Sequence, residues 1–463
     1  MSQSFWASRA WLAGGWQDDV LLRAGADGCW SQIESGAAAP ADSVRLAGPV
    51  IAPLVDAHSH AFQRAMAALA ERRGEGGAGA DDDFWSWRDR MYRVALRITP
   101  DQLRAVAAQL YVELLRGGYT QVCEFHYLQH DTDGSRYADP MLLSWAVADA
   151  ADEAGLGLTL LPVLYERAGF AQVALREDQR RFATTPADVV ALQRAAQRSS
   201  RRHLNAGIAI HSLRAAAAGS IRELHRLADG VEGPIHIHAA EQTAEIDDCL
   251  AATGARPIEW LLRERLLDAR WQLVHATHAL PAEIEGVAAS GAGVVICPTT
   301  EANLGDGLPD LPRWLAAGVP LAIGSDSHVT RGWAEELRWL DYGQRLALRR
   351  RNVAACPATQ PATAARLYDA ALAAGAASAG LAKWGLQVGA RADFLVLDAQ
   401  DPSLLGIPPS HTLDALVFSS PGDAIRDVYV AGAAVIRNRR HAAETAIAGR
   451  FAQAMQQLWP DAD

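Results

Sequence analysis

Eight short apolar runs, separated by longer segments of helical periodicity, occupy the sequence between about residues 50 and 330. Apolar runs of about four to eight residues are typical of buried strands, whereas apolar residues repeating every three or four positions are typical of helices. The predicted strands are residues 55–60, 120–125, 158–165, 207–211, 235–238, 272–275, 293–298 and 321–326. This alternation predicts an α/β fold, a (β/α)₈ barrel of the TIM type.

Start and stop signals support the helices between these strands. Thr99 and Pro100 supply an N-cap and a first-turn proline, and Gly117 ends the apolar periodicity that follows. The same reasoning predicts helices over residues 139–154, closed by Gly155, and over residues 186–199.

The sequence pattern at the two ends of the chain differs from that of the predicted barrel. Strand-like pieces occur at residues 43–46, 393–398 and 427–430. We therefore predict a small β-sandwich domain built from residues 1–50 and 385–445, a metal-dependent barrel over 51–384 and a C-terminal helical tail over 446–463. The stretch 333–376 is largely helical in pattern, and the glycine-rich segment 74–83 is predicted to be a mobile loop after the first barrel strand.

Composition excludes several classes of protein. A net charge of -11 argues against nucleic acid as the main partner. No apolar run approaches the roughly 20 residues that cross a bilayer, and the N-terminus lacks a signal-peptide core. The five cysteines form no CxxC pair, so a disulfide framework is not expected. We expect a cytoplasmic protein with no membrane or nucleic-acid partner.

Metal-ligand residue types stand at the ends of the predicted strands. His58 and His60 are one residue apart, and on a strand such side chains point the same way and can bind one ion. His238 and Asp326 end two other strands, and the four together form a donor set suited to Zn²⁺ or Fe²⁺. Such an ion lowers the pKa of a bound water to about 7, which makes hydroxide available for hydrolysis.

One ion per chain is expected. The chain has a single lysine, Lys383, which lies beyond the eighth predicted strand. No strand therefore offers a carboxylated lysine that would bridge two metal ions, and we expect a mononuclear site, most simply zinc.

Two further groups complete a hydrolytic centre. Glu241 follows His238 by three residues, where its carboxylate can carry a proton to a leaving nitrogen. His275 ends the next strand and can orient water or stabilise charge. Glu241 taken alone is better explained as a helix first-turn acid favoured by the helix dipole.

The order of these motifs resembles the amidohydrolase superfamily, in its mononuclear deaminase branch, over essentially the whole chain. The matching segments are Asp56-Ala57-His58-Ser59-His60, His238-Ala239-Ala240-Glu241, Val274-His275-Ala276-Thr277-His278 and Gly324-Ser325-Asp326-Ser327. The resemblance implies that His58, His60, His238 and Asp326 bind the metal. It also implies that Glu241, His275 and Asp326 are catalytic.

Finer features resemble deiminases of this branch that release ammonia from an N-formimidoyl amino acid with two carboxylates, a step of histidine degradation. They are His60-Ala61-Phe62-Gln63-Arg64, Phe84-Trp85-Ser86-Trp87-Arg88, Glu124-Phe125-His126-Tyr127 and Ile210-His211-Ser212-Leu213-Arg214. The resemblance implies that the substrate is held by Gln63, Arg88, Tyr127, His211 and Arg214. It also implies a homodimer.

The predicted arginines agree with such a small-molecule substrate, because guanidinium groups bind carboxylates through two parallel hydrogen bonds. Arg88 or Arg214 taken singly is better explained by a solvated surface charge. Two other functions remain open at this point. One is a barrel deaminase of a purine, pyrimidine or related ring, and the other is a barrel that has lost catalysis and serves as a binding scaffold.

Overall fold

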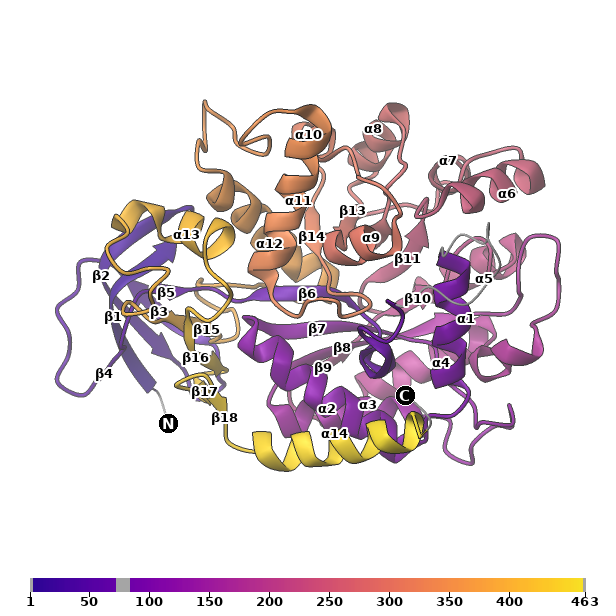
Figure 1. The fold of residues 1–463 in the computed structure, drawn as a ribbon, viewed down its shortest axis with the longest axis horizontal. Coiled ribbons are helices and arrows are strands. Elements are labelled where there is room, and N and C mark those ends of the chain that lie inside the picture. The colour runs from indigo at the N-terminus through magenta and orange to yellow at the C-terminus, as the bar shows by residue number, and fades with distance from the viewer. Residues whose placement is uncertain (1–2, 72–83, 461–463) are drawn as a thin grey trace.

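A computed structural model describes residues 3–71 and 84–460 of the chain. Figure 1 shows a strand-and-helix barrel beside a smaller β region in which the indigo N-terminal and golden C-terminal segments lie together. This architecture confirms the predicted fold class, a (β/α)₈ barrel with a small β-sandwich built from both chain ends. The predicted loop at residues 74–83 lies outside the described residues.

The barrel strands are parallel and follow one another in chain order. They are β6 (Leu54–Ser59), β7 (Tyr119–His126), β8 (Gly157–Leu164), β10 (Ile208–Ile210), β11 (Ile235–Ala239), β12 (Trp271–His275), β13 (Gly293–Ile296) and β14 (Leu321–Ile323). A short strand, β9 (Leu204–Ala206), pairs with β8. All eight predicted strands are present, but β14 ends at Ile323, so Asp326 lies in the turn that follows the strand.

The barrel closes between β6 and β14. Ser59 and Asp326 form a parallel bridge, and the Asp326 amide N–H donates to the carbonyl oxygen of His58 at 2.9 Å. At Gly324, an added Cβ would lie 2.7 Å from the Cβ of His58, a distance that real Cβ atoms essentially never show. Glycine is therefore required for the two strand ends to approach, and the closure lies at two predicted metal ligands.

Local signals fix the helices that cover the barrel. In α2 (Pro100–Arg116), the Thr99 side chain accepts from the Gln102 amide N–H, and the Gln102 side chain accepts in return from the Thr99 N–H. Helices α3 (Leu142–Ala154) and α4 (Pro186–Gln197) also agree with prediction, and Gly155 ends α3 in the left-handed conformation. The helical stretch after β14 is two helices, α11 (Trp333–Leu348) and α12 (Thr363–Ala379).

The remaining helices lie in the connections and at the chain end. They are η1 (Ala61–Met66), α1 (Phe84–Ala95), η2 (Glu177–Phe182), α5 (Ala218–Ala228), α6 (Thr243–Thr253), α7 (Pro257–Arg263), α8 (Pro281–Ser290), α9 (Pro298–Leu304), α10 (Leu311–Ala316), η3 (Pro409–His411), α13 (Thr412–Phe418) and α14 (Glu444–Leu458). The last of these, yellow in Figure 1, runs along α2 at the foot of the barrel.

Strands from both chain ends form a second sheet. They are β1 (Gln3–Leu12), β2 (Gly15–Ala24), β3 (Trp30–Glu34), β4 (Val44–Arg45), β5 (Val50–Ile51), β15 (Phe394–Leu397), β16 (Ile425–Val430), β17 (Ala433–Arg437) and β18 (Arg440–His441). The two ends join where Ile51 of β5 pairs with Leu395 of β15. Phe5, Trp30, Phe394 and Tyr429 pack in a core separate from that of the barrel.

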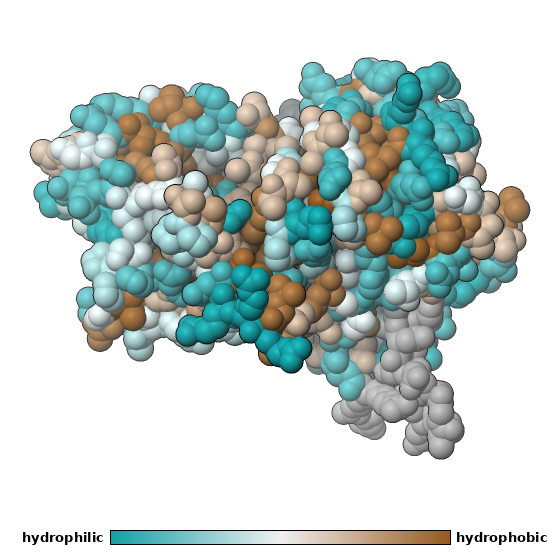
Figure 2. Space-filling view, turned by 90° about the horizontal axis from the view of Figure 1, so that it is seen from above, coloured by the Kyte–Doolittle hydropathy of each residue, from teal (hydrophilic) through white to brown (hydrophobic). Residues whose placement is uncertain are grey.

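The surface mixes polar and apolar residues. Figure 2 shows hydrophobic residues interspersed with hydrophilic ones across the face in view. Among the described helices, none combines the length and the apolar character needed to cross a membrane.

Candidate active site

A pocket of about 730 Å³ opens at the carboxyl ends of the barrel strands. In barrels of this type, catalytic groups lie at this end because several strand ends and their following loops meet there. All the predicted catalytic and substrate-binding residues line the pocket, and of the predicted metal ligands only His58 does not. His58 is fully buried behind it.

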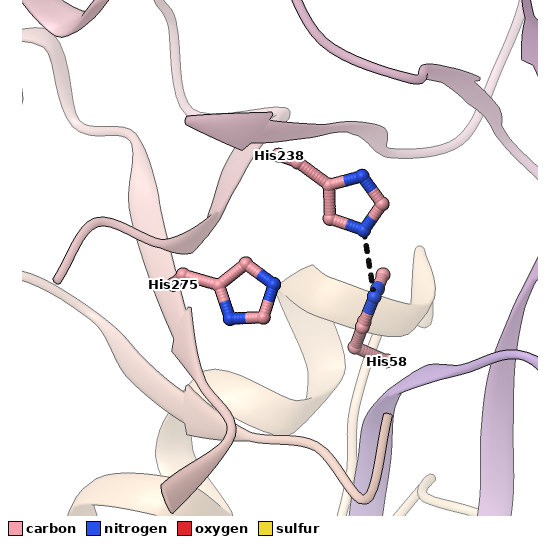
Figure 3. Close-up of side chains that lie close together, drawn as sticks. All are labelled: His58, His238 and His275. Carbon is pink, nitrogen blue, oxygen red and sulfur yellow. Dashed lines mark hydrogen bonds between the residues drawn. The ribbon is translucent and has the colours of Figure 1, made fainter. Parts of the chain in front are cut away.

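The four predicted metal ligands are brought together. The Nε2 atoms of His58 and His238 are 3.0 Å apart, and an Asp326 carboxylate oxygen lies 3.4 Å from Nε2 of His58 and of His60. Two overlapping groups, His58 with His60 and Asp326 and His58 with His238 and His275, have ligand atoms within 4.8 Å of one another. Figure 3 shows the second group, with the rings of His58, His238 and His275 turned toward one another.

Contacts behind the histidines set which nitrogen faces the cluster. Nδ1 of His60 donates to the carbonyl oxygen of Phe125 at 2.9 Å, and Nδ1 of His238 donates to that of His211 at 2.8 Å. A carbonyl oxygen only accepts, so each ring presents an unprotonated Nε2 when it is neutral. Burial lowers the pKa of His58, His60 and His238. Neutral imidazoles are the form that binds a metal ion, so the donor set fits a divalent cation.

Residues at the end of β12 and in the turn after β14 have an uncommon backbone conformation. His275 has φ +67° and Asp326 has φ +46°, in the left-handed region that non-glycine residues seldom adopt. Buried Asp56 fixes the turn after β14, because its carboxylate accepts from the Ser325 amide N–H at 2.8 Å and from the Ser325 hydroxyl at 2.5 Å. Such strain is maintained by the surrounding contacts and is concentrated at functional sites.

His275 lies among three carboxylates next to the metal ligands. Its Nε2 lies 3.7 Å from Glu241 and 3.8 Å from Asp326, and its Nδ1 lies 3.4 Å from Glu301. Burial alone lowers the pKa of His275, but Glu241, Glu301 and Asp326 outweigh burial and raise it. Burial raises the pKa of Glu241. The pair therefore combines a cationic imidazole with a carboxyl group that holds a proton more readily than usual.

The predicted substrate-binding residues line the rest of the pocket, and two of them lie beside metal ligands. The ring centre of Tyr127 is 5.1 Å from that of His60, and the ring centre of His211 is 5.1 Å from that of His238. Arg214 is 8% exposed, and Arg88, on α1, is half-buried with its Cζ 5.5 Å from the centre of the Tyr92 ring. Nε2 of Gln63 donates to the Tyr127 hydroxyl at 3.0 Å. Burial and the charge of Arg214 lower the pKa of His211, so its ring is neutral. The pocket thus holds carboxylates beside the metal ligands together with two guanidinium groups, and the nearby charges of Glu241 and Glu245 favour the cationic form of Arg214 by raising its pKa.

Several residues in or beside the pocket were not predicted from the sequence. Tyr165 follows β8 directly, so its place at a strand end was a usable signal, as was that of Glu301 soon after β13. Glu245, which accepts from the Glu241 amide N–H at 3.0 Å, and Tyr92 lie within helices. Nothing in the local pattern of a helix marks such residues as part of a site.

The chain belongs to the amidohydrolase family, whose profile matches residues 50–435. It is therefore a hydrolase of a metal-dependent family. Formimidoylglutamate deiminase of Pseudomonas aeruginosa is 46% identical to it over 457 residues, which cover 98% of this chain and 99% of that protein. A crystal structure of an amidohydrolase from Brucella melitensis matches with a TM-score of 0.92 and 40% identity, covering 98% of this chain and 99% of that one.

A more distant relative has another substrate in its name. A 5-methylthioadenosine/S-adenosylhomocysteine deaminase of Natronomonas pharaonis is 29% identical over 84% of this chain and 82% of that protein.

Proposed function

We propose that this chain hydrolyses N-formimidoyl-L-glutamate to N-formyl-L-glutamate and ammonia, as a step of histidine degradation. Water adds to the formimidoyl carbon, a C=O bond forms, and the C–N bond to the departing nitrogen breaks. The observation that carries the proposal is the charge of the pocket lining, in which Glu241 and Asp326 lie beside His275, and Arg88 and Arg214 supply two guanidinium groups. The name and 46% identity of the P. aeruginosa relative support it.

We infer that His58, His60, His238 and Asp326 bind one divalent ion, Zn²⁺ or Fe²⁺. Three neutral imidazoles and a carboxylate are a donor set that both ions accept. When bound, such an ion supplies Lewis acidity and lowers the pKa of water to about 7. The ligand atoms of His58, His60 and Asp326 lie within 4.8 Å of one another, and Nε2 of His238 lies 3.0 Å from that of His58, which supports this assignment.

The proton-transfer roles follow from position and charge. Asp326 accepts a proton from the attacking water, and Glu241 passes protons to the nitrogen that leaves as ammonia. His275, kept cationic by its carboxylate neighbours, stabilises negative charge that develops at the attacked centre. The carboxylates also attract the amidinium end of the substrate, which is positively charged before reaction.

The far end of the pocket holds the two substrate carboxylates. Arg88 and Arg214 supply charge-assisted hydrogen bonds, and the neutral His211 and the Gln63–Tyr127 pair supply polar contacts beside them. Charges of opposite sign at the two ends orient the substrate with its formimidoyl carbon toward the metal ligands.

A second candidate function is deamination of a purine or related ring. Aromatic walls formed by Tyr127, Tyr165 and Phe182 favour it, as does the deaminase from N. pharaonis. Two arginines in the same pocket favour the diacid, because a neutral ring offers them no anionic partner.

The deciding experiment compares ammonia release from N-formimidoyl-L-glutamate with release from a panel that includes adenosine, 5-methylthioadenosine, guanine and cytosine. We expect turnover of the formimidoyl substrate at least about 100-fold more efficient than of any ring. Activity confined to the rings would reject the proposal. Metal analysis of the same preparation is expected to give one ion per chain, and two tightly held ions would contradict the mononuclear assignment.

Two further predictions concern the protein in the cell. We propose a homodimer located in the cytoplasm. Light scattering of the purified protein tests the first, and fractionation of the producing cell tests the second.

A further inference from the structure

A buried amide joins two tyrosines of the pocket. Gln179, in η2, is completely buried, and its Nε2 donates to the hydroxyl of Tyr92 at 3.1 Å and to that of Tyr165 at 3.0 Å. The two tyrosines come from α1 and from the residue after β8, and both line the pocket, whereas Gln179 does not. The amide therefore lies behind the two hydroxyls.

The orientation of this amide is fixed by a third contact. Oε1 of Gln179 accepts from the backbone N–H of Arg176 at 3.0 Å. An N–H group only donates, so the oxygen of the amide must face Arg176 and the NH₂ group must face the tyrosines. Both N–H donors of Gln179 are consequently directed at hydroxyl oxygens.

Counting protons shows what the hydroxyls can still do. Each hydroxyl has one proton to donate, and each already accepts from Gln179. Apart from Gln179, the only partner of either hydroxyl among the side chains of residues 3–71 and 87–460 is the hydroxyl of the other tyrosine, and a contact between the two uses only one proton. At least one O–H therefore remains to donate toward the pocket.

The positions of the charges indicate what receives this proton. The charges of Arg88 and Arg214 both act on Tyr165, so the hydroxyl pair shares their end of the pocket. A donor O–H beside guanidinium groups suits an anion and not a cation. Tyr92 and Tyr165 are 3% and 1% exposed, which makes a hydrogen bond there stronger than one in water.

We propose that Tyr92 and Tyr165, oriented by Gln179, donate to a carboxylate of the substrate and give the enzyme its selectivity for a diacid. Gln179 is a positioning residue in this arrangement, because it acts only through the tyrosines. The inference rests on the proposed function and deepens it.

The first test removes the hydroxyls and keeps the rings. Tyr92→Phe, Tyr165→Phe and the double variant are compared with the wild type on N-formimidoyl-L-glutamate and on its analogues with either carboxylate replaced by a carboxamide. We expect kcat/KM for the diacid to fall roughly 10-fold or more in at least one single variant, the effect of losing one hydrogen bond to a charged group. For the carboxamide at the affected position, the loss should be much smaller.

The second test replaces the NH₂ group of Gln179, which donates to the tyrosines, by an oxygen that can only accept, without changing the size of the side chain. Gln179→Glu keeps an acceptor for the Arg176 N–H but presents oxygens to both tyrosines, so each hydroxyl turns its proton away from the pocket. We expect the same loss of selectivity for the diacid although both tyrosines remain. A role limited to packing would change the melting temperature and leave selectivity unaltered.

Tyr137→Phe is the matched control, because the Tyr137 hydroxyl donates to Asp131 at 3.0 Å outside this pocket. Unchanged selectivity in all the Tyr92, Tyr165 and Gln179 variants that bind metal normally would overturn the inference. If the wild type releases no ammonia from the substrate, the proposed function fails by itself. Calorimetry with glutarate then tests the hydroxyls separately: weaker binding in the phenylalanine variants supports them, and equal binding overturns them.

Discussion

The two ends of the pocket are built in different ways. The metal end comes from the ends of β6, β11 and β12 and the turn after β14, and backbone contacts such as that between Asp326 N–H and His58 O fix it. The arginine end draws Arg88 and Tyr92 from α1 and positions Tyr165 through η2. Under the proposed assignment, the chemistry lies on the rigid barrel, and substrate choice lies largely on helices and connections that can vary without disturbing it.

The comparison is tested most strongly at Glu241, where we expect the largest effect. Glu241→Gln removes the proton-transferring carboxylate but touches no metal ligand, so kcat should fall by about 100-fold or more while metal content is unchanged. Steady-state kinetics and metal analysis measure the two quantities. Glu223→Gln, at an exposed position of α5, is the control and should behave as the wild type. Normal turnover of the Glu241 variant would remove it from catalysis.

Arg214→Met tests the opposite end. Losing a charge-assisted bond to a substrate carboxylate should cost about 1.5 to 3 kcal/mol of transition-state binding, seen as a lower kcat/KM. Arg226→Met, on the exposed side of α5, should have no such effect. Equal kinetics for the Arg214 variant and the wild type would show that this end does not bind the substrate.

Gly324→Ala examines the rigidity of the metal end without changing a ligand. The new Cβ would clash with the Cβ and backbone of His58, so we expect the ligand turn to shift and metal affinity to fall by about 10-fold or more. Competition with a chelator measures the affinity. In Gly219→Ala the added Cβ meets nothing within 4 Å, so metal affinity should be retained. Tight metal binding by the Gly324 variant would mean that the strand ends tolerate displacement.

The smallest effect is expected at Glu113, which lies outside the pocket. It accepts from Arg64 at 2.7 Å and 3.0 Å and lies 3.2 Å from Arg331. Burial alone raises the pKa of Glu113, but Arg64 and Arg331 hold it below its ordinary value of 4.5. Glu113→Gln should lower the free energy of unfolding by about 1 kcal/mol at pH 7 and leave kcat near normal.

This stabilisation depends on pH with a definite sign. A lowered pKa in the folded state gives stability that is present above the unfolded pKa and lost as pH falls through the folded one. The difference between the wild type and the Glu113 variant should therefore shrink below about pH 4.5. Denaturant unfolding at several pH values measures it. A difference that persists at lower pH would show that the ion pair is not its source.

The sequence predicted the metal end more completely than the arginine end. His58, His60 and His238 end apolar strands, and the period of a strand dictates that such side chains share one face. Asp326 lies beside them although its strand ends earlier. The turn that brings it there has a left-handed backbone conformation, which the periodicity of the sequence does not encode. At the other end, Gln179 had no signal, since its role depends on two tyrosines that are distant in sequence.

The sheet shared by both chain ends has a consequence for biosynthesis. Because β5 pairs with β1 on one side and, through Ile51 and Leu395, with β15 on the other, its second edge has no partner until the barrel and the chain beyond it have left the ribosome. During that interval the apolar side chains of Phe5 and Val50 lack the shelter of Phe394 and Val396. The nascent N-terminal strands are thus a natural target for chaperones, and a stalled or prematurely terminated product would present them as an aggregation-prone edge.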